Sequence, residues 1–439
     1  MKLTMIGGGY VGLVTAACLA DFGHRVTVVD KEAGKIDALR AGRVPIHEPG
    51  LDQLIAANRQ DERLEFSTDV AGAVAEAEAV FIAVGTPTRA EDGHADLSYV
   101  FAAAREVAPA LRPDAVVVMK STVPVGTGDA VEGIVRELRP GTDILVASNP
   151  EFLRAGAAIN DFKRPDRIIV GTEHARARDV MSEVYRPLFL NQSPIVFTDR
   201  RTAELTKYAA NAFLATKITF INVIADLCEA VGANVQDIAR GMGLDNRIGA
   251  KFLHPGPGFG GSCFPKDTLA LVRTGQENDV VLSVVSSAHD SNDRRKLAMV
   301  ERILSALGDP ARGKTVAVLG LTFKPNTDDM REAPSLVILP ALIEAGVTVR
   351  AYDPKGMTVA RPILPGVEFA EDAYRCAAGA DALVILTEWD AFRALDLRRL
   401  KATLSRPVVV DLRNIYRPSE MQAAGFTYHS VGRRTVVAN

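Results

Sequence analysis

Residues 2–30 read K-L-T-M-I-G-G-G-Y-V-G-L-V-T-A-A-C-L-A-D-F-G-H-R-V-T-V-V-D, and this stretch predicts the start of an α/β fold. A short apolar strand (2–6) runs into glycines, and a helix of small and apolar residues follows until Gly23. A second strand (25–29) then ends at Asp30. Strand, glycine turn, helix and strand in this order form a βαβ unit.

The turn between the first strand and the helix carries the pattern G-x-G-x-x-G. Its glycines are Gly7, Gly9 and Gly12. Such a turn lets backbone N–H groups and a helix N-terminus approach a pyrophosphate. Asp30 stands 21 residues after Gly9, where a carboxylate accepts hydrogen bonds from ribose hydroxyls and repels a 2′-phosphate. We therefore expect NAD rather than NADP, although Lys31 and Lys35 complicate that choice. The alternative is a flavodoxin-like turn without this ligand.

Working outward from this unit, helical stretches alternate with further apolar strands. The strands are expected at 79–84, 115–119, 144–147 and 167–170. This alternation predicts a parallel sheet with helices on both faces. Two strands end in G-T-P-T (85–88) and S-T-V-P-V-G-T (121–127). Because ligands lie beyond the carboxyl ends of such strands, Thr86 and Thr122 are candidates to touch the nicotinamide half. Ordinary strand exits are the alternative.

The rest of the chain predicts a long helix and a second sheet. Residues 202–231 contain no Gly or Pro and have helical apolar spacing. A helix of about thirty residues is long for a globular protein, and we expect a spine between domains and a candidate dimer surface. A single helix buried between the domains, which needs no dimer, is the alternative. The stretches that repeat the first part are 314–320, 344–353 and 380–387. They predict a second doubly wound domain, whose degraded glycine pattern argues against a second dinucleotide site.

Composition narrows the class of protein. The 439 residues are 47% hydrophobic and 24% charged, with a net charge of −3. These values are typical of soluble globular chains, and they give no reason to expect nucleic acid or a membrane as partner. Four cysteines without a C-x-x-C pair and seven scattered histidines predict neither a disulfide framework nor a metal site. A reducing, cytoplasmic compartment is therefore expected.

One loop points to covalent chemistry. Residues 254–267 read H-P-G-P-G-F-G-G-S-C-F-P-K-D, and the glycines let a loop close tightly on a ligand. Cys263 lies in this loop, with Lys266 and Asp267 three and four residues further on. A thiol is a useful nucleophile only as thiolate, which a nearby ammonium stabilises. The remaining cysteines, Cys18, Cys228 and Cys376, lie in helix-like stretches where inert buried thiols are common.

A nicotinamide site together with a nucleophilic cysteine favours oxidation of an aldehyde to an acid. Alcohol oxidation needs a base and a hydride acceptor but no thiol. An aldehyde has no good leaving hydride until a nucleophile adds to it. A thiolate can add, lose the hydride and leave a thioester that water cleaves. Both oxidations could occur in one site.

With these motifs in order, the chain resembles the UDP-glucose 6-dehydrogenases of the UDP-glucose/GDP-mannose dehydrogenase family. The matching motifs are G-G-G-Y-V-G-L (7–13), E-P-G-L (48–51), V-G-T-P-T (84–88), S-T-V-P-V-G-T (121–127), N-P-E-F-L-R (149–154), E-L-T-K-Y-A-A-N-A-F-L-A-T-K-I (204–218), P-G-P-G-F-G-G-S-C-F-P-K-D (255–267) and F-K-P-N-T-D-D-M-R-E (323–332). The resemblance implies oxidation of UDP-glucose to UDP-glucuronate through a cysteine thiohemiacetal and thioester, with two NAD per sugar. The same chemistry on UDP-N-acetylmannosamine, UDP-N-acetylglucosamine or GDP-mannose is the runner-up, and a binding regulator that has lost catalysis is a further alternative.

The resemblance also implies a role for each matching residue. The catalytic groups are Cys263, Lys207, Asn211, Asp267, Glu151 and Thr122. The cofactor-binding residues are Gly7, Gly9, Tyr10, Val11, Gly12, Asp30, Lys35, Thr86, Thr122, Glu151, Lys266 and Arg331. The substrate-binding residues are Glu151, Phe152, Leu153, Arg154, Lys207, Asn211, Phe252, Leu253, His254, Pro255, Gly256, Gly260 and Lys324. Taken singly, each charged residue has a structural alternative, such as a helix face or a turn cap.

The expected fold class is α/β, with two Rossmann-like doubly wound parallel-sheet domains joined by a helical domain with a long central helix. The expected boundaries are 1–200 for the NAD-binding domain, 201–300 for the helical, dimerising domain and 301–439 for the sugar-nucleotide-binding domain. A homodimer through the central helix is expected, with a site completed by domain closure. Two departures from the family pattern are Ala155, where Glu is common, and R-E-A-P at 331–334 in place of R-E-S-P.

Overall fold

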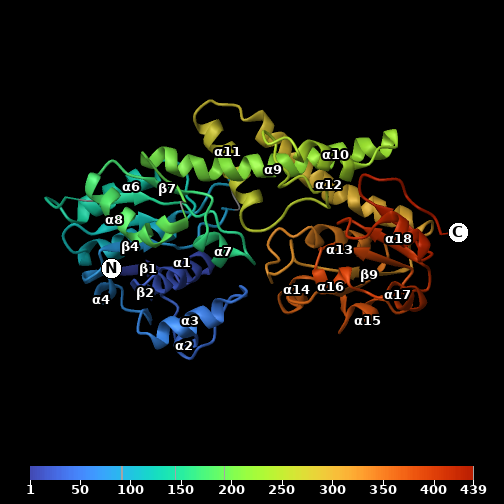
Figure 1. The fold of residues 1–439 in the computed structure, drawn as a ribbon, viewed down its shortest axis with the longest axis horizontal. Coiled ribbons are helices and arrows are strands. Elements are labelled where there is room, and N and C mark those ends of the chain that lie inside the picture. Colours follow the sequence, from blue (N-terminus) through green and yellow to red (C-terminus); the bar gives the residue numbers. More distant parts are fainter. Residues whose placement is uncertain (90–91, 144, 192, 439) are drawn as a thin grey trace. The chain divides into compact units, whose positions relative to one another are not determined.

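The computed structural model describes residues 1–89, 92–143, 145–191 and 193–438. Its chain divides into two compact units (Figure 1). The first unit comprises Met1–Ala210 and Arg273–Asp279, and the second comprises Asn211–Val272 and Val280–Asn439. The predicted division into three domains at 200 and 300 stays a prediction.

The described part of the first unit forms an eight-stranded sheet in the order β3-β2-β1-β4-β5-β6-β7-β8. The strands are β1 (Lys2–Ile6), β2 (Arg25–Val29), β3 (Leu64–Ser67), β4 (Ala79–Ile82), β5 (Val116–Met119), β6 (Leu145–Ser148), β7 (Ile168–Gly171) and β8 (Ile195–Thr198). Strand order reverses between β1 and β4, which is the switch point where ligands bind in doubly wound sheets.

Helices cover both faces of this sheet because its strands are apolar on both sides. The helices are α1 (Tyr10–Asp21), α2 (Ala33–Arg40), α3 (Leu51–Gln60), α4 (Val70–Ala75), α5 (Ser98–Val107), α6 (Thr127–Leu138), α7 (Ala158–Lys163) and α8 (Ala175–Tyr185). Within β5, Val116 and Val118 pack in the core that contains α1, α3, α7 and α8. Val117 and Met119 pack in the core that contains α4, α5 and α6. This two-residue alternation is the pleat of a strand.

One strand pair departs from the predicted parallel sheet. β7 pairs with β6 in the antiparallel sense, through Ser148 and Gly171, whereas the other paired strands of the sheet are parallel. A parallel crossover needs a helix long enough to carry the chain back across the sheet. The helix between these strands, α7, has six residues and spans only about 9 Å. The first residue of the predicted strand 144–147 lies outside the described residues.

A helix longer than predicted follows the first sheet. α9 runs from Arg200 to Val231, so it begins two residues before the predicted 202. Asp199 explains this start, because its carboxylate accepts hydrogen bonds from the Thr202 amide at 2.8 Å and the Thr202 hydroxyl at 2.7 Å. The helix is continuous across the division of the chain, with Lys207 in the first unit and Asn211 in the second.

The described part of the second unit contains a six-stranded sheet in the order β11-β10-β9-β12-β13-β14, which repeats the order of the first six strands of the first sheet. The strands are β9 (Thr315–Leu319), β10 (Thr348–Tyr352), β11 (Glu368–Phe369), β12 (Ala382–Ile385), β13 (Val408–Asp411) and β14 (Thr427–Ser430). This confirms the predicted second doubly wound, parallel-sheet domain.

Helices again lie on both faces of the sheet, as Figure 1 shows for β9 and its neighbours. The helices of this unit besides α9 are α10 (Val235–Gly243), α11 (Phe264–Glu277), α12 (Ser283–Leu307), α13 (Ser335–Glu344), α14 (Met357–Ile363), α15 (Ala373–Ala377), α16 (Asp390–Arg393), α17 (Leu397–Thr403) and α18 (Pro418–Ala423). Like α9, α11 crosses the division of the chain, because its residues from Arg273 onward belong to the first unit. Val316 and Val318 pack in the core with α12 and α13, and Ala317 and Leu319 pack in the core with α15 to α18. None of the described helices is long and apolar enough to cross a membrane.

Candidate active site

The glycine turn after β1 is shaped by close backbone contacts. Gly7 has φ +108°, and a Cβ there would lie 2.6 Å from the Ala83 carbonyl oxygen. A Cβ on Gly12 would lie 1.9 Å from the Gly7 carbonyl oxygen. Gly9 differs, because a Cβ there would meet no described atom within 4 Å. The first and third glycines close the turn, and the second leaves open space at the N-terminus of α1, which suits a pyrophosphate.

Asp30 is held beside this turn as an ionised carboxylate. Its Oδ2 accepts hydrogen bonds from the Gly8 amide at 2.8 Å and from Lys35 Nζ at 3.0 Å. The Glu32 amide donates to Oδ1 at 3.0 Å. Burial opposes ionisation, but the donors from Glu32, Lys35 and Gly8 outweigh it and hold the pKa of Asp30 below its ordinary value. An ionised Asp30 suits the ribose hydroxyls of NAD and repels a 2′-phosphate.

The ends of β4 and β5 are tied together at the same edge of the sheet. Thr86 Oγ1 donates to the Thr122 carbonyl at 2.9 Å, and Ser121 Oγ donates to the Val84 carbonyl at 2.7 Å. The two threonines predicted to meet the nicotinamide half are therefore neighbours. Both lie beyond the carboxyl ends of their strands, where ligands of such sheets bind.

Tyr10 and Val11 open α1 and are partly exposed. The Tyr10 hydroxyl donates to the carboxylate of Glu48. Glu48 also accepts hydrogen bonds from the amides of Gly156 at 2.6 Å and Ala158 at 2.8 Å. Glu48 belongs to the quoted motif E-P-G-L but received no predicted role. It joins the start of α1 to the loop that follows Glu151.

The centre of the candidate site in the first unit is a buried ion pair. Lys207 Nζ on α9 lies 3.0 Å from Glu151 Oε1, and both side chains are almost fully buried. The Leu153 amide donates to Glu151 Oε2 at 2.6 Å. Burial opposes ionisation of Glu151, but the ammonium of Lys207 and the Leu153 amide hold its pKa below the ordinary value. Glu151 is therefore a carboxylate at neutral pH.

The side chains after Glu151 are arranged around this pair. The Phe152 ring lies 5.2 Å from Lys207 Nζ and 3.7 Å from the guanidinium carbon of Arg167. Arg154 forms a two-point pair with Asp161 of α7, with Nε–Oδ2 at 3.0 Å and a terminal nitrogen 2.5 Å from Oδ1. Arg154 thus has a protein partner that the sequence did not suggest.

In the second unit, the glycine-rich loop predicted to surround the substrate is held by two helices. The Gly256 amide donates to Asn222 Oδ1 of α9 at 2.8 Å, and Arg295 of α12 donates to the Gly256 carbonyl at 2.5 Å. Asn292 of α12 accepts from the Phe259 amide at 2.7 Å and donates to its carbonyl at 3.1 Å. Two asparagines and an arginine replace the backbone partners that an irregular buried loop lacks.

The glycines of this loop are required by close packing. A Cβ on Gly260 would lie 2.2 Å from the Glu332 carbonyl oxygen, and one on Gly261 would lie 2.8 Å from the Phe323 ring. The Gly261 amide donates to the Arg331 carbonyl at 2.8 Å. These contacts join the loop that carries Cys263 to the motif F-K-P-N-T-D-D-M-R-E.

Cys263 lies at the beginning of α11, and its carbonyl accepts from the Asp267 amide at 2.8 Å. α11 begins at Phe264, so Lys266 and Asp267, three and four residues after Cys263, lie in its first turn. Cys263 is partly exposed, while Cys18, Cys228 and Cys376 are buried. A thiolate is stabilised at a helix N-terminus, so this position suits a nucleophile.

Asp267 forms hydrogen bonds with two other predicted site residues of this unit, Asn211 and Lys266. Its Oδ2 accepts from Asn211 Nδ2 at 2.6 Å, and its Oδ1 accepts from Lys266 Nζ at 2.7 Å. Asp267 is 1% exposed. Lys207 and Asn211 are four residues apart on α9 and so point to the same side of that helix. One face of α9 therefore presents an ammonium paired with Glu151 and, one turn later, an amide paired with Asp267.

The remaining predicted substrate and cofactor residues of the second unit flank the loop. Phe252 has φ +65°, and its ring centroid lies 6.1 Å from that of Phe264. Leu253, Pro255 and Gly256 are buried. His254 Nε2 lies 2.8 Å from the Arg413 carbonyl oxygen.

Two cationic residues of the F-K-P-N-T-D-D-M-R-E motif also have described partners. Lys324 Nζ lies 5.4 Å from the Phe323 ring centroid. Arg331 pairs with Asp329 at 2.7 Å.

A turn matching the dinucleotide turn follows β9, but protein groups fill it. Thr322, which corresponds to Gly9, is 1% exposed. Asp353, which follows β10 as Asp30 follows β2, is also 1% exposed. Its Oδ2 accepts hydrogen bonds from the Leu321 amide at 2.7 Å and from Trp389 Nε1 at 3.1 Å. The space that Gly9 leaves open in the first unit is occupied here by side chains.

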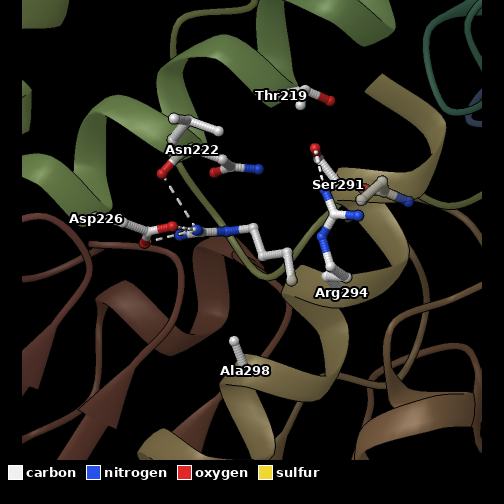
Figure 2. Close-up of a pocket in the computed structure, with 9 residues that line it drawn as sticks. Thr219, Asn222, Asp226, Ser291, Arg294 and Ala298 are labelled. Carbon is white, nitrogen blue, oxygen red and sulfur yellow. Dashed lines mark hydrogen bonds and ion pairs between the residues drawn. The ribbon is translucent and has the colours of Figure 1, made fainter. Parts of the chain in front are cut away.

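Figure 2 shows a pocket of the second unit that none of the predicted site residues lines. Thr219, Asn222 and Asp226 come from α9, and Ser291, Arg294 and Ala298 come from α12. Arg295, which also lines it, pairs with Asp226 at 2.8 Å. The pocket thus borders the side chains that hold Gly256. Sequence reasoning missed Asn222, Asn292 and Arg295, because nothing in their spacing links two distant helices to one loop.

Comparisons with known proteins place the whole chain in one family. Residues 1–189 match the NAD binding domain of the UDP-glucose/GDP-mannose dehydrogenase family, 201–294 its central domain and 317–418 its UDP binding domain. The UDP-glucose 6-dehydrogenase of Rhizobium meliloti strain 1021 is 63% identical over 435 residues, covering 99% of this chain and 100% of the relative.

Solved structures agree with this assignment. A UDP-glucose dehydrogenase of Pyrobaculum islandicum has a TM-score of 0.91 at 39% identity over 98% of each chain. A UDP-D-ManNAc dehydrogenase of Pyrococcus horikoshii has a TM-score of 0.86 at 27% identity over 99% of each chain.

Proposed function

The chain belongs to the UDP-glucose/GDP-mannose dehydrogenase family and is an NAD-dependent oxidoreductase with a nucleotide-sugar substrate, and from this we propose that it oxidises UDP-glucose to UDP-glucuronate. The C6 hydroxymethyl group loses two electrons twice, first to an aldehyde and then to a carboxylate. Bound NAD supplies the hydride acceptor for each of the two oxidations. The remaining steps belong to residues of this chain.

In the first oxidation the C6 hydroxyl gives up its proton as the C6–H bond breaks. We assign the stabilisation of charge on that oxygen to Lys207 and Asn211, which extend from the same side of α9. The pairing of Asn211 with Asp267 at 2.6 Å supports this role, because it fixes the amide. Asp267 then acts by orienting Asn211, Lys266 or a water molecule.

In the second oxidation the Cys263 thiolate adds to the C6 aldehyde. The new C–S bond gives a thiohemiacetal, whose oxygen takes a proton. Loss of the C6 hydrogen as hydride and of the hydroxyl proton leaves a thioester on Cys263. The partly exposed position of Cys263 at the start of α11 supports this assignment.

Water then cleaves the thioester, and the C–S bond breaks to restore the thiolate. Glu151 is the candidate base for this water, with Thr122 as a neighbour in the family pattern. Its carboxylate is ionised at neutral pH and can therefore accept a proton. Balanced over the whole reaction, one UDP-glucose, one water and two NAD⁺ give one UDP-glucuronate, two NADH and three protons.

The observation that carries the reaction type is the cluster of Asn211, Asp267 and Lys266 beside Cys263 at the first turn of α11. The substrate assignment rests on the 63% identity to a UDP-glucose 6-dehydrogenase over nearly the full chain. UDP-N-acetylmannosamine is the second candidate, since a UDP-D-ManNAc dehydrogenase has a similar structure.

A panel of sugar nucleotides tests the proposal. The purified protein is given excess NAD and a limiting amount of UDP-glucose, UDP-N-acetylglucosamine, UDP-N-acetylmannosamine or GDP-mannose. We expect two NADH per UDP-glucose and slow or no turnover of the others. Turnover of another sugar nucleotide without turnover of UDP-glucose would overturn the substrate assignment, and one NADH per sugar would overturn the two-step reaction.

The assembly that we propose is a homodimer through α9. Its exposed apolar side chains support this, because a helix face in water does not normally expose so many. They are Phe213, Phe220, Val223, Leu227 and Val231. We also propose a reducing, cytoplasmic compartment, because the mechanism requires Cys263 to remain a thiol.

A further inference from the structure

Lys120 is a buried lysine that the proposed mechanism does not use. It follows β5 and is 4% exposed. Its Nζ donates to Asn149 Oδ1 at 3.1 Å and lies 3.4 Å from the Tyr185 hydroxyl. It also faces the rings of Phe162 and Tyr185 at about 6 Å. In the part of the chain that the structure describes, no carboxylate lies within ion-pair distance of this nitrogen.

A buried ammonium without a directly bonded carboxylate is costly, and lysines are almost never buried unless paired. Burial lowers the pKa of Lys120 to about 8, while the carboxylate of Glu151 raises it and the ammonium of Lys207 lowers it further. Lys120 therefore interacts with both members of the Glu151–Lys207 pair. Such strongly perturbed groups gather at functional sites.

Asn149 connects Lys120 to Glu151 through the backbone. The Asn149 amide donates to the Met119 carbonyl at 2.8 Å, and its Nδ2 donates to the Ile169 carbonyl at 2.8 Å. The Tyr185 hydroxyl donates to Asn149 Oδ1 at 2.6 Å. Asn149 is thus fixed from three strands or helices, and only Pro150, whose φ is locked by its ring, separates it from Glu151.

We propose that Lys120 is a positioning residue for Glu151: it fixes Asn149 beneath the Asn-Pro-Glu segment, and its charge favours the ionised carboxylate that thioester hydrolysis needs. This inference rests on the function proposed above. Lys120 touches neither substrate nor cofactor in this assignment, so its effect falls on kcat rather than on the KM for UDP-glucose.

The charged and titratable groups around Glu151 fix the direction of the effect. Lys207 faces it from α9, Lys120 from the end of β5 and Tyr10 from α1, while Tyr185 of α8 faces Lys120. Removing the positive charge of Lys120 makes the ionised form of Glu151 less favourable. The acid limb of the kcat profile then moves to higher pH.

Two variants separate charge from packing. Lys120→Met and Tyr185→Phe each remove one group that contacts Asn149 Oδ1, but only Lys120→Met removes a charge. The kcat and the KM for UDP-glucose are measured from pH 3.5 to 9.5 at saturating NAD, beside thermal unfolding of each variant at each pH, because the acid limb of Glu151 lies below the ordinary carboxyl pKa. We expect the acid limb of Lys120→Met to rise by at least about half a unit, which lowers kcat roughly threefold on the acid side. The limb of Tyr185→Phe stays in place, and KM changes less than twofold in both.

An unmoved acid limb in Lys120→Met would overturn the inference, and so would an equal shift in Tyr185→Phe, since both would mark a structural role. If Lys120→Met does not fold, Lys120→Gln serves the same test, because its amide keeps a donor without the charge. Thioester hydrolysis by Glu151→Gln at the parent rate would overturn the role given to Glu151 and this inference with it. Absence of UDP-glucose turnover by the parent protein would instead overturn the proposed function.

Discussion

Cys263 differs from the other three cysteines in its position rather than in its chemistry. It lies at the beginning of α11 and is partly exposed, whereas Cys228 lies within α9 and is buried. We expect Cys263→Ala to lower UDP-glucuronate formation at least about a thousandfold, because the variant lacks the thiol that adds to the aldehyde and is then acylated as the thioester. Chromatographic detection of the acid and the NADH yield measure this loss.

Cys228→Ala is the matched control for that substitution. Removing this buried sulfur costs roughly 1 kcal/mol of stability and leaves the rate of acid formation unchanged. Acid formed by Cys263→Ala at the parent rate would exclude the covalent mechanism.

Asp30 is the residue that we expect to govern the choice of dinucleotide. Its carboxylate is ionised beside the open turn at Gly9, so Asp30→Ala removes both the acceptor for the ribose hydroxyls and the repulsion of a 2′-phosphate. Hydrogen bonds to a charged group contribute about 1.5 kcal/mol. Losing them therefore raises the NAD dissociation constant roughly tenfold. NADP binding improves at the same time. Calorimetric titration with each dinucleotide measures both changes.

Asp37→Ala on α2 is the control, since the Asp37 side chain is 72% exposed. It leaves both dissociation constants unchanged. If Asp30→Ala retains the parent preference for NAD, the assignment of Asp30 to the ribose is wrong.

At the scale of elements, α12 holds the glycine-rich loop that ends at Cys263, directly before α11. Asn292 makes two hydrogen bonds to the backbone of Phe259, and Asn292→Ala leaves those buried groups unsatisfied. The expected cost is about 1–3 kcal/mol of unfolding free energy. We also expect a roughly tenfold lower kcat, because small displacements of a catalytic group are expensive. Chemical denaturation and steady-state kinetics measure the two effects.

The affinity for NAD in Asn292→Ala should fall less than kcat does, because the glycine turn expected to hold the pyrophosphate lies after β1 and does not contact Asn292. Asn278→Ala provides a control that removes only an exposed bond to the Thr274 carbonyl. A normal kcat in Asn292→Ala, despite reduced stability, would show that the loop keeps its shape without this contact.

The elements with strong local patterns could be predicted from the sequence. The βαβ start at 2–30 and the helix from 202 to 231 were right within two residues, because apolar periodicity and glycines act locally. The direction of β7 was not predictable, since a strand paired in either sense has the same side-chain alternation. The start of α11 at Phe264 was hidden by the glycines before it and by Pro265, which is permitted in the first turn of a helix.

Within the candidate site, residue types could be predicted but partners could not. The pairing of Lys207 with Glu151 and of Asn211 with Asp267 joins positions 56 residues apart, and only the fold brings them together. Lys120 was overlooked because a lysine after an apolar strand normally ends at the surface. Glu48, Asn222 and Arg295 were overlooked because they bind backbone groups, and sequence spacing carries no record of such bonds.

At the scale of the whole molecule, the exposed apolar face of α9 supports assembly. Phe213 is 65% exposed and Leu227 is 55% exposed. We expect the double variant Phe213→Asp/Leu227→Asp to be monomeric at micromolar concentration, because burying two carboxylates in an apolar interface costs several kcal/mol. Light scattering after gel filtration measures the mass.

Leu138→Asp at the end of α6 is the control for surface charge, since Leu138 is also exposed. It should leave the mass unchanged. A parent protein that is monomeric under the same conditions would contradict the proposed dimer, and a double variant with the parent mass would place the interface elsewhere.

The two sheets share one strand order, but the turn after the first strand is open to solvent in one sheet and filled by side chains in the other. The turn after β1 leaves space at Gly9, while the turn after β9 is filled by Thr322 and by the bond from Trp389 to Asp353. The folded state of the first unit is therefore stabilised by a dinucleotide that binds at this turn. A ligand at a hundred times its dissociation constant adds about 2.7 kcal/mol to the folded state. We therefore expect the resistance of the first unit to unfolding and proteolysis to increase with the concentration of dinucleotide. The turn of the second unit is filled by its own side chains, so its stability should not depend on that concentration.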